Sequence, residues 1–199
     1  MKADEAADLM DKGREQDLFK RRAAVVIAFC AMLLAITGLG GNNATKEAVN
    51  TNIQASNYWN FFQAKNMRQT AFVLAASEFE LAWANDQQLS ADARAAILRK
   101  MEDYRKTIAR YESEPETQEG KKELIARARA EEKKRDHALK QDPYFDYAEA
   151  LLQIAIVLIS VAIVAEQIWL SYLGGVLGLI GAVLMVNGFL LLVEIPFLS

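Results

Sequence analysis

The chain has 199 residues, of which 52% are hydrophobic and 25% are charged, and its formal net charge is −3. Residues 42–147 hold equal numbers of basic and acidic side chains, a balance that provides no basic surface and excludes a nucleic-acid partner. The single cysteine, Cys30, excludes a disulfide within one chain. His137 is the one histidine, and no zinc-ligand, Walker or nucleophile motif occurs, so we expect no metal, no cofactor and no enzymatic activity.

Three apolar segments are predicted to cross a membrane as helices. They are residues 23–41, 148–165 and 168–193. Each of the last two is long enough to span the ~30 Å hydrocarbon core of a bilayer at about 1.5 Å per residue. Glu166 and Gln167 alone separate them, so they are predicted to form an antiparallel hairpin.

The N-terminal tail, residues 1–22, is polar and is expected to be either a weakly amphipathic helix or a mobile tail. Its basic residues are Lys2, Lys12, Arg14, Lys20, Arg21 and Arg22. They also fit a signal peptide, but no convincing cleavage site follows, which favours a retained anchor over 23–41. Basic residues beside a span favour a cytoplasmic tail. Three crossings then place residues 42–147 and the tail 194–199 outside, and the Glu166-Gln167 turn inside.

A long helix predicted over Thr45–Ala84 forms the first arm of an extramembrane helical hairpin within residues 42–147. Gly38, Gly40 and Gly41 precede this helix and predict a break where the chain leaves the membrane. The distal half of the arm has an apolar face that needs a partner helix. That face holds Phe72, Ala76, Phe79 and Trp83.

The return arm of this hairpin is predicted to be broken into two helices. Residues 85–89 end the first arm, and Ser90 is a good N-cap for a helix over 91–113. That helix carries the coiled-coil-like spacing Ile97, Met101, Tyr104, Ile108 and Tyr111. Glu114-Pro115 interrupts the arm, and a charged helix over 121–140 continues it. Asp142-Pro143 is predicted to start the second membrane helix, with proline at its first position.

The membrane-proximal part of the first arm mixes amides with aromatic residues, among them Trp59, Phe61 and Phe62. The favoured interpretation is a belt of aromatic rings at the headgroup layer, with ordinary solvated amides around it. The alternative is an interface between subunits close to the membrane.

Polar residues at the start of the second span and within the third form a candidate functional cluster: Asp146, Glu149, Gln153 and Asn187. An ionisable group inside a membrane is costly unless it has a partner. We expect Asn187 to pair with Glu149 and to hold the two crossings together. The alternative is that Glu149 lies at a wet helix start, where its negative charge is favoured.

Glycines line one face of the third apolar segment, at Gly174, Gly178, Gly181 and Gly188. Small residues let membrane helices approach closely. This face is therefore predicted to pack either within the hairpin or between subunits.

Two stretches resemble the bacterial membrane proteins of domain-of-unknown-function family 4337. They are IQASNYWNFFQAK over residues 53–65 and YAEALLQIAIVL over residues 147–158. The resemblance covers most of the chain, including one anchor, an external helical region and a terminal hairpin. It implies an inner-membrane protein of bacterial type, and it supplies no catalytic residues.

The predicted fold is an all-α membrane protein with three transmembrane helices and a long extramembrane helical hairpin between the first two. The favoured function is a non-enzymatic structural or accessory protein whose partners are the lipid bilayer and either further copies or a larger membrane complex. The alternative is a channel or transporter element lined by Glu149, Gln153 and Asn187, which needs oligomers because three crossings do not enclose a pore. An enzyme is the least favoured class.

Overall fold

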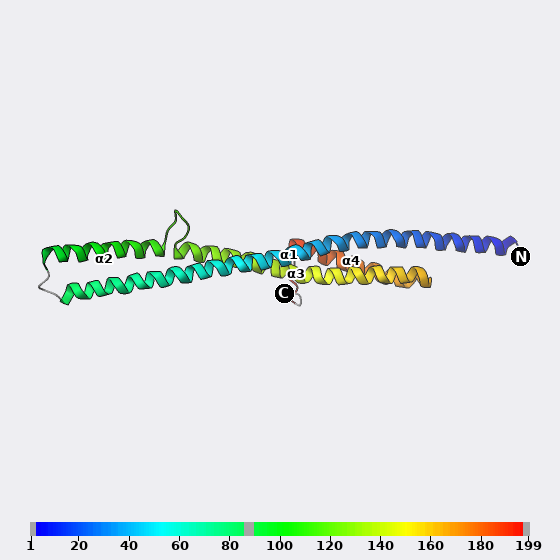
Figure 1. The fold of residues 1–199 in the computed structure, drawn as a ribbon. Coiled ribbons are helices and arrows are strands. Elements are labelled where there is room, and N and C mark those ends of the chain that lie inside the picture. Colours follow the sequence, from blue (N-terminus) through cyan, green and yellow to red (C-terminus); the bar gives the residue numbers. More distant parts are fainter. Residues whose placement is uncertain (1–2, 86–89, 197–199) are drawn as a thin grey trace. The chain divides into compact units, whose positions relative to one another are not determined.

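The computed structural model describes residues 3–85 and 90–196, with side chains described for 13–84 and 90–196. The described residues form four helices and no strand: α1 Ala3–Asn85, α2 Ala91–Glu112, α3 Lys121–Ala165 and α4 Ile168–Leu190 (Figure 1). They divide into two compact units. One unit joins Met1–Ala48 to Asp136–Ser199, and the other is Val49–Arg135. We call them the apolar unit and the polar unit.

Helix α1 continues without a break through the glycines that were predicted to end it. Gly38, Gly40 and Gly41 are all helical, and so are the residues of the tail from Ala3 onward. The prediction of a break after the first span is therefore wrong. The reason lies in packing, because a Cβ atom at Gly40 would lie 2.6 Å from the ring of Phe145. Gly40 and Gly41 make room for Phe145 while the helix continues.

The break predicted at Asp142-Pro143 is also absent. These residues were expected to start a separate membrane helix, but α3 begins at Lys121 and Pro143 lies inside it. Proline removes one helical hydrogen bond and crowds the preceding turn, so its neighbours must compensate. Tyr144 and Phe145 are almost fully buried, and Asp142 accepts a 2.9 Å hydrogen bond from the hydroxyl of Thr45 on α1. These contacts hold the segment helical against the local preference of proline.

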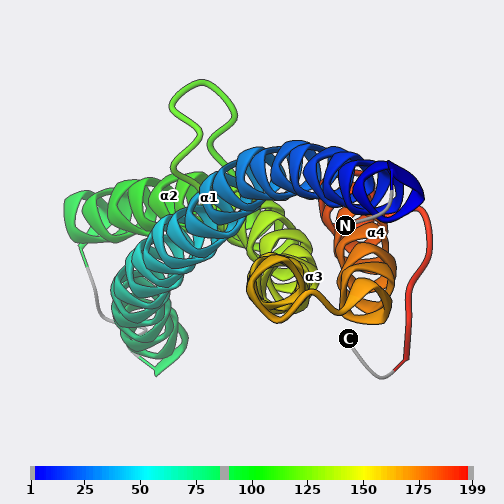
Figure 2. The same cartoon turned by 90° about the vertical axis from the view of Figure 1, so that its right-hand side faces the viewer.

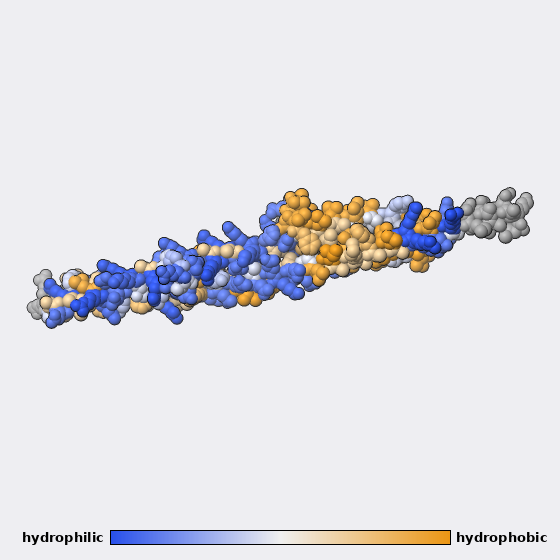
Figure 3. All heavy atoms as spheres, turned by 90° about the horizontal axis from the view of Figure 1, so that it is seen from above, coloured by the Kyte–Doolittle hydropathy of each residue, from blue (hydrophilic) through white to orange (hydrophobic). Residues whose placement is uncertain are grey.

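In the apolar unit, α3 and α4 pack side by side with the first part of α1 (Figure 2). Helices α1, α3 and α4 are each long and apolar enough to cross a membrane. Their outward surface is apolar (Figure 3), with exposed valines and leucines such as Val157, Val161, Val176 and Leu179. Helix α4 ends at Leu190, short of the predicted Val193, because Leu191 adopts a left-handed conformation with φ 44°.

In the polar unit, α1 runs antiparallel to α2 and to the first part of α3. Ring contacts join the predicted apolar faces: Phe72 lies 5.4 Å from Tyr104 and 5.8 Å from Tyr111, and Phe79 lies 5.8 Å from Tyr104. Ser90 caps α2 as predicted, accepting a 3.2 Å hydrogen bond from the amide of Ala93. The predicted turn falls largely on residues 86–89, which lie outside the described residues.

Candidate functional site

The end of α4 is closed by a side-chain clamp on the backbone. Asn187 donates through Nδ2 to the carbonyl oxygen of Val193 at 2.8 Å, and its Oδ1 accepts from the amide of Val193 at 3.0 Å. The backbone carbonyl of Asn187 also accepts from the amide of Leu191 at 2.7 Å. One side chain thus satisfies both backbone groups of a residue that follows a left-handed turn.

Tyr144 of α3 also holds this C-terminal segment. Its hydroxyl donates to the carbonyl oxygen of Val193 at 3.1 Å and accepts from the amide of Ile195 at 2.8 Å. Lys140 pairs with Glu194 at 2.7 Å, and this hydrogen bond raises the pKa of Lys140 and lowers that of Glu194. We call Tyr144, Asn187 and Val193 the C-terminal clamp. It fixes residues 191–196 to α3.

The clamp shows that Asn187 does not pair with Glu149, so that predicted pairing is wrong. Both groups of the Asn187 amide are occupied by Val193, because the turn at Leu191 brings the chain back onto α4. Glu149 is half-buried and accepts instead from Gln153 at 3.1 Å, one turn further along α3. Of the predicted cluster, these two residues contact each other.

The surroundings of Glu149 place it between two helices. A Cβ atom at Gly38 of α1 would lie 4.0 Å from its Oε2, so the carboxylate faces a helix surface that has no side chain. Asp146 lies one turn before Glu149 and is exposed, and desolvation, followed by the charge of Asp142, raises its pKa. The arrangement provides carboxylate and amide oxygens as hydrogen-bond acceptors.

The glycine face of α4 packs against α3 and α1 within the apolar unit. A Cβ atom would lie 2.7 Å from Ile159 at Gly174 and 3.0 Å from Leu152 at Gly181. Backbone oxygens of α3 lie nearly as close to both positions, at 3.0 and 3.1 Å.

The other two glycines of the predicted face are filled by different partners. A Cβ atom at Gly178 would lie 3.1 Å from the sulfur of Cys30, and one at Gly188 would lie 3.0 Å from the ring of Phe145. All four glycines thus serve close approach between helices of one chain.

Two of the three aromatic residues proposed for a membrane-proximal interface point into the polar unit. Trp59 donates to Glu132 at 2.8 Å and meets the ring of Phe62 edge-on at 5.7 Å. Lys121 lies 5.7 Å from the ring of Phe62. Phe61 is partly exposed, and its ring lies against the ammonium of Lys65.

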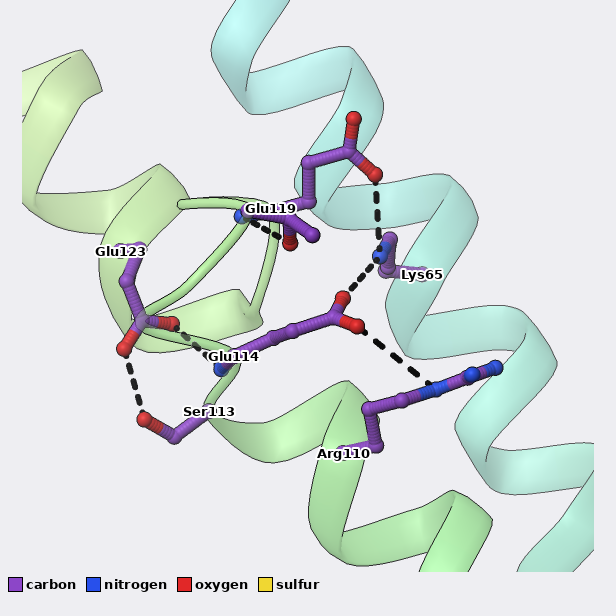
Figure 4. A network of polar contacts seen from close by, with 7 residues as sticks. Lys65, Arg110, Ser113, Glu114, Glu119 and Glu123 are labelled. Atoms are coloured by element: carbon purple, nitrogen blue, oxygen red, sulfur yellow. Dashed lines mark hydrogen bonds and ion pairs between the residues drawn. The ribbon is translucent and has the colours of Figure 1, made fainter.

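A buried lysine, which the sequence analysis did not single out, organises the break between α2 and α3 (Figure 4). The side chain of Lys65 on α1 is 8% exposed and pairs with Glu114 and Glu119, both at 3.6 Å. Its ammonium also lies 5.4 Å from the rings of Phe61 and Tyr111. A buried charge persists only where it is paired, and here two carboxylates and two ring faces compensate it.

The loop between α2 and α3 is folded around the carboxylate of Glu123 (Figure 4). Glu123 accepts from the hydroxyl of Ser113 at 2.6 Å and from the amide of Glu114 at 3.2 Å, and the Ser113 hydrogen bond lowers the pKa of Glu123. A Cβ atom at Gly120 would overlap the carboxylate of Glu123 and the nitrogen of Glu114, so glycine is required there. The sequence indicates this network of ion pairs and hydrogen bonds only by a single lysine, Lys65, within a run of amide and aromatic residues.

A second polar layer lies one turn along α1 from Lys65. The amide of Gln69 donates to the carbonyl of Ile108 at 3.0 Å and to Glu112 at 3.1 Å, and it accepts from Lys121 at 2.7 Å. The Gln69 hydrogen bond, ahead of the pairing with Lys121, lowers the pKa of Glu112. These two layers connect α1 to both halves of the return arm.

Among the described residues, no group of three or more histidine, cysteine, aspartate or glutamate side chains could hold a metal ion. Comparison with curated proteins and with solved structures found no match. The sequence profile of one family, described as a domain of unknown function (DUF4337), matches residues 19–191. The matched region begins in α1, just before Lys20, and ends at Leu191, the left-handed residue after α4. The chain therefore belongs to the DUF4337 family.

Proposed function

We propose that the chain is a non-enzymatic structural or accessory protein of the bacterial inner membrane that associates with itself or with a larger membrane complex. The observation that carries this proposal is helix continuity. Helices α1 and α3 each run from an apolar, membrane-length segment into the polar unit without an intervening loop. Long helices that continue from a membrane-length apolar segment into a polar unit suit a supporting or docking element.

The polar unit is held together by several cross-links between its helices. Its helices are connected by aromatic contacts, by the buried Lys65 and by the Gln69 layer. Such cross-links hold a helical surface in one shape, which lowers the entropy cost of binding a partner.

The orientation that we propose has the tail 1–22 in the cytoplasm and residues 42–147 in the periplasm. It is supported by contacts at one end of the apolar unit. Lys20 lies 3.9 Å from Glu166, and Gln16 donates to Glu166 at 3.3 Å. Two crossings separate the tail from the Glu166 turn, and two crossings return the chain to the side where it began, so these contacts agree with the proposed threefold crossing; the basic residues of the tail give the cytoplasmic side. An impermeant maleimide should therefore label Lys100→Cys and Ser199→Cys, each in a Cys30→Ala background, in intact cells. Protection of both positions would invert the orientation.

The channel alternative has weaker support. It requires Glu149, Gln153 and Asn187 to line one polar path. The side-chain amide of Asn187, however, is hydrogen-bonded to the backbone of Val193. Glu149 and Gln153 remain, and they bond to each other.

Association is tested by native mass spectrometry of the full-length protein released from nanodiscs. The expected result is a species larger than the 22.2 kDa chain, either a multiple of that mass or a complex with another protein. A single 22.2 kDa species together with no co-purified partner would overturn the proposal.

A further inference from the structure

Within the polar unit, helix α1 carries two apolar stripes, one on each of two opposite sides of the helix. The inner stripe, which includes Phe72, Ala76 and Phe79, is packed against α2 through the rings of Phe72 and Phe79. We define the outer stripe as six exposed residues: Ile53, Ala64, Met67, Ala71, Leu74 and Leu81. Its four large side chains are between 52% and 74% exposed. Large apolar side chains gathered on one side of a helix are typical of an interaction surface.

The outer stripe has the spacing of a helix-pairing seam. From Ala64 to Leu81 its positions follow each other at alternate steps of three and four residues, with Glu78 as the one polar position in that run. This spacing keeps one line of side chains facing a partner helix. The small residues Ala64 and Ala71 alternate with Met67 and Leu74, so large side chains of one helix can enter spaces beside the small side chains of another.

Charge is almost absent from this part of α1. Between Val49 and Ser77 the charged residues are Lys65 and Arg68, and Lys65 is buried in its own pairing network. By contrast, α2 and the first part of α3 are densely charged. Depletion of charge is the compositional sign of an interface core. A surface of apolar and amide side chains offers nothing to a charged partner, and it matches another uncharged helix.

We propose that the outer stripe of α1 is covered by the outer stripe of a second copy of this chain, in parallel and in register. The inference rests on the association proposed above, and it names the partner and the surface. Two copies inserted in one membrane carry α1 in the same direction. In a parallel pair in register, each residue faces the same residue of the other copy. Charged residues beside the stripe would then face like charges, which is unfavourable. The residues beside the stripe are uncharged apart from Arg68, as in Gln54, Ser56, Gln63, Thr70 and Ser77.

The polar residues at seam positions between Ile53 and Leu81 are Asn57, Asn60 and Glu78. Asn57 lies one heptad before Ala64, at an a position of the seam, and an asparagine at an a position pairs with its own copy and fixes register. Glu78 would face its own copy with like charge, which weakens the distal end of the pair. Glu78→Leu should therefore tighten the dimer.

The test is disulfide trapping of the full-length protein in native membranes, in a Cys30→Ala background. Met67→Cys and Leu74→Cys should form a dimer of twice the chain mass on mild oxidation, because facing seam positions bring Cα atoms within disulfide reach. Asn66→Cys is the matched control, since Asn66 is exposed on another face of α1 and should form little dimer. Equal trapping at all three positions, no trapping at 67 and 74, or a disulfide to a protein of another mass would each overturn the proposal.

A second measurement separates this proposal from the general one. Leu74→Glu should raise the dissociation constant of the dimer about tenfold or more, because like charges then face each other. Asn66→Glu should leave it unchanged, and circular dichroism should show equal helix content in both variants. If Leu74→Glu leaves an assembly intact in native mass spectrometry, the second-copy surface is refuted while association stands. If the unaltered chain is monomeric and has no partner, association itself fails.

Discussion

The C-terminal clamp predicts that Asn187→Leu loosens the segment after α4. The substitution removes the acceptor for the amide of Val193 and one of the two donors to its carbonyl, while the hydroxyl of Tyr144 still donates to that carbonyl. One part-buried amide is then unpaired, at a cost of about 1–3 kcal/mol. Since about 1.4 kcal/mol is a tenfold change, opening of the segment should become roughly 5- to 150-fold more frequent.

Hydrogen exchange of the full-length protein in nanodiscs measures this opening directly. Peptides that cover residues 191–196 should exchange faster in Asn187→Leu, with the amides of Val193 and Ile195 most affected. Gln153→Leu is the control, because its exposed side chain bonds to Glu149 alone and has no contact with the segment. Unchanged exchange over 191–196 in Asn187→Leu would refute the clamp.

A double-mutant cycle then identifies the partner of Asn187. Asn187→Leu and Tyr144→Phe act on the same carbonyl of Val193, so their effects on unfolding free energy should couple by about 0.5 kcal/mol or more. Asn187→Leu and Glu149→Gln share no hydrogen-bond partner and should add within about 0.3 kcal/mol. A larger coupling with Glu149 than with Tyr144 would restore the pairing that the sequence predicted.

Three further predictions concern the packing and charges. Lys65→Met should lower the unfolding free energy by about 1–3 kcal/mol in denaturant titration, because two carboxylates lose their shared cation, and the half-exposed Glu119→Gln should cost less. Gly40→Ala should cost about 1–3 kcal/mol by overpacking the ring it faces, whereas Gly175→Ala, with nothing within 4 Å, should be neutral or stabilising in the same assay. The pKa of Glu112 is lowered on folding from its ordinary 4.5, so its contribution is present above that pH and is lost as the pH falls below it; Glu112→Gln should flatten this part of the stability curve.

Sequence patterns were sufficient wherever local chemistry decides the structure. Ser90 was identified as an N-cap from residue type and position, and the structure shows that bond. The aromatic face of Phe72 and Phe79 was predicted to need a partner helix, and Tyr104 packs against both rings. In these cases a neighbouring amide or a helical spacing carries the whole signal, so one sequence contains it.

Patterns failed where a contact distant in sequence outweighs a local preference. Gly40 and Pro143 are helix breakers by propensity, and both lie inside long helices. Gly40 makes room for the ring of Phe145, and Phe145 follows the proline by two residues. Asn187 was assigned the wrong partner for a related reason. The left-handed turn at Leu191, which no motif announces, decides where its amide points.

The two stripes of α1 explain why its outer surface is hard to see in the sequence. A helix with one apolar side has a clear amphipathic signal, since its apolar residues add in one direction. In α1 the inner stripe around Phe72 and the outer stripe around Leu74 point in opposite directions, so their contributions cancel and the segment resembles an ordinary mixed helix. The structure separates the two stripes: Tyr104 of α2 packs on the inner stripe, whereas Leu74 of the outer stripe is exposed. Charge depletion from Val49 to Ser77 survives this cancellation, because it does not depend on direction.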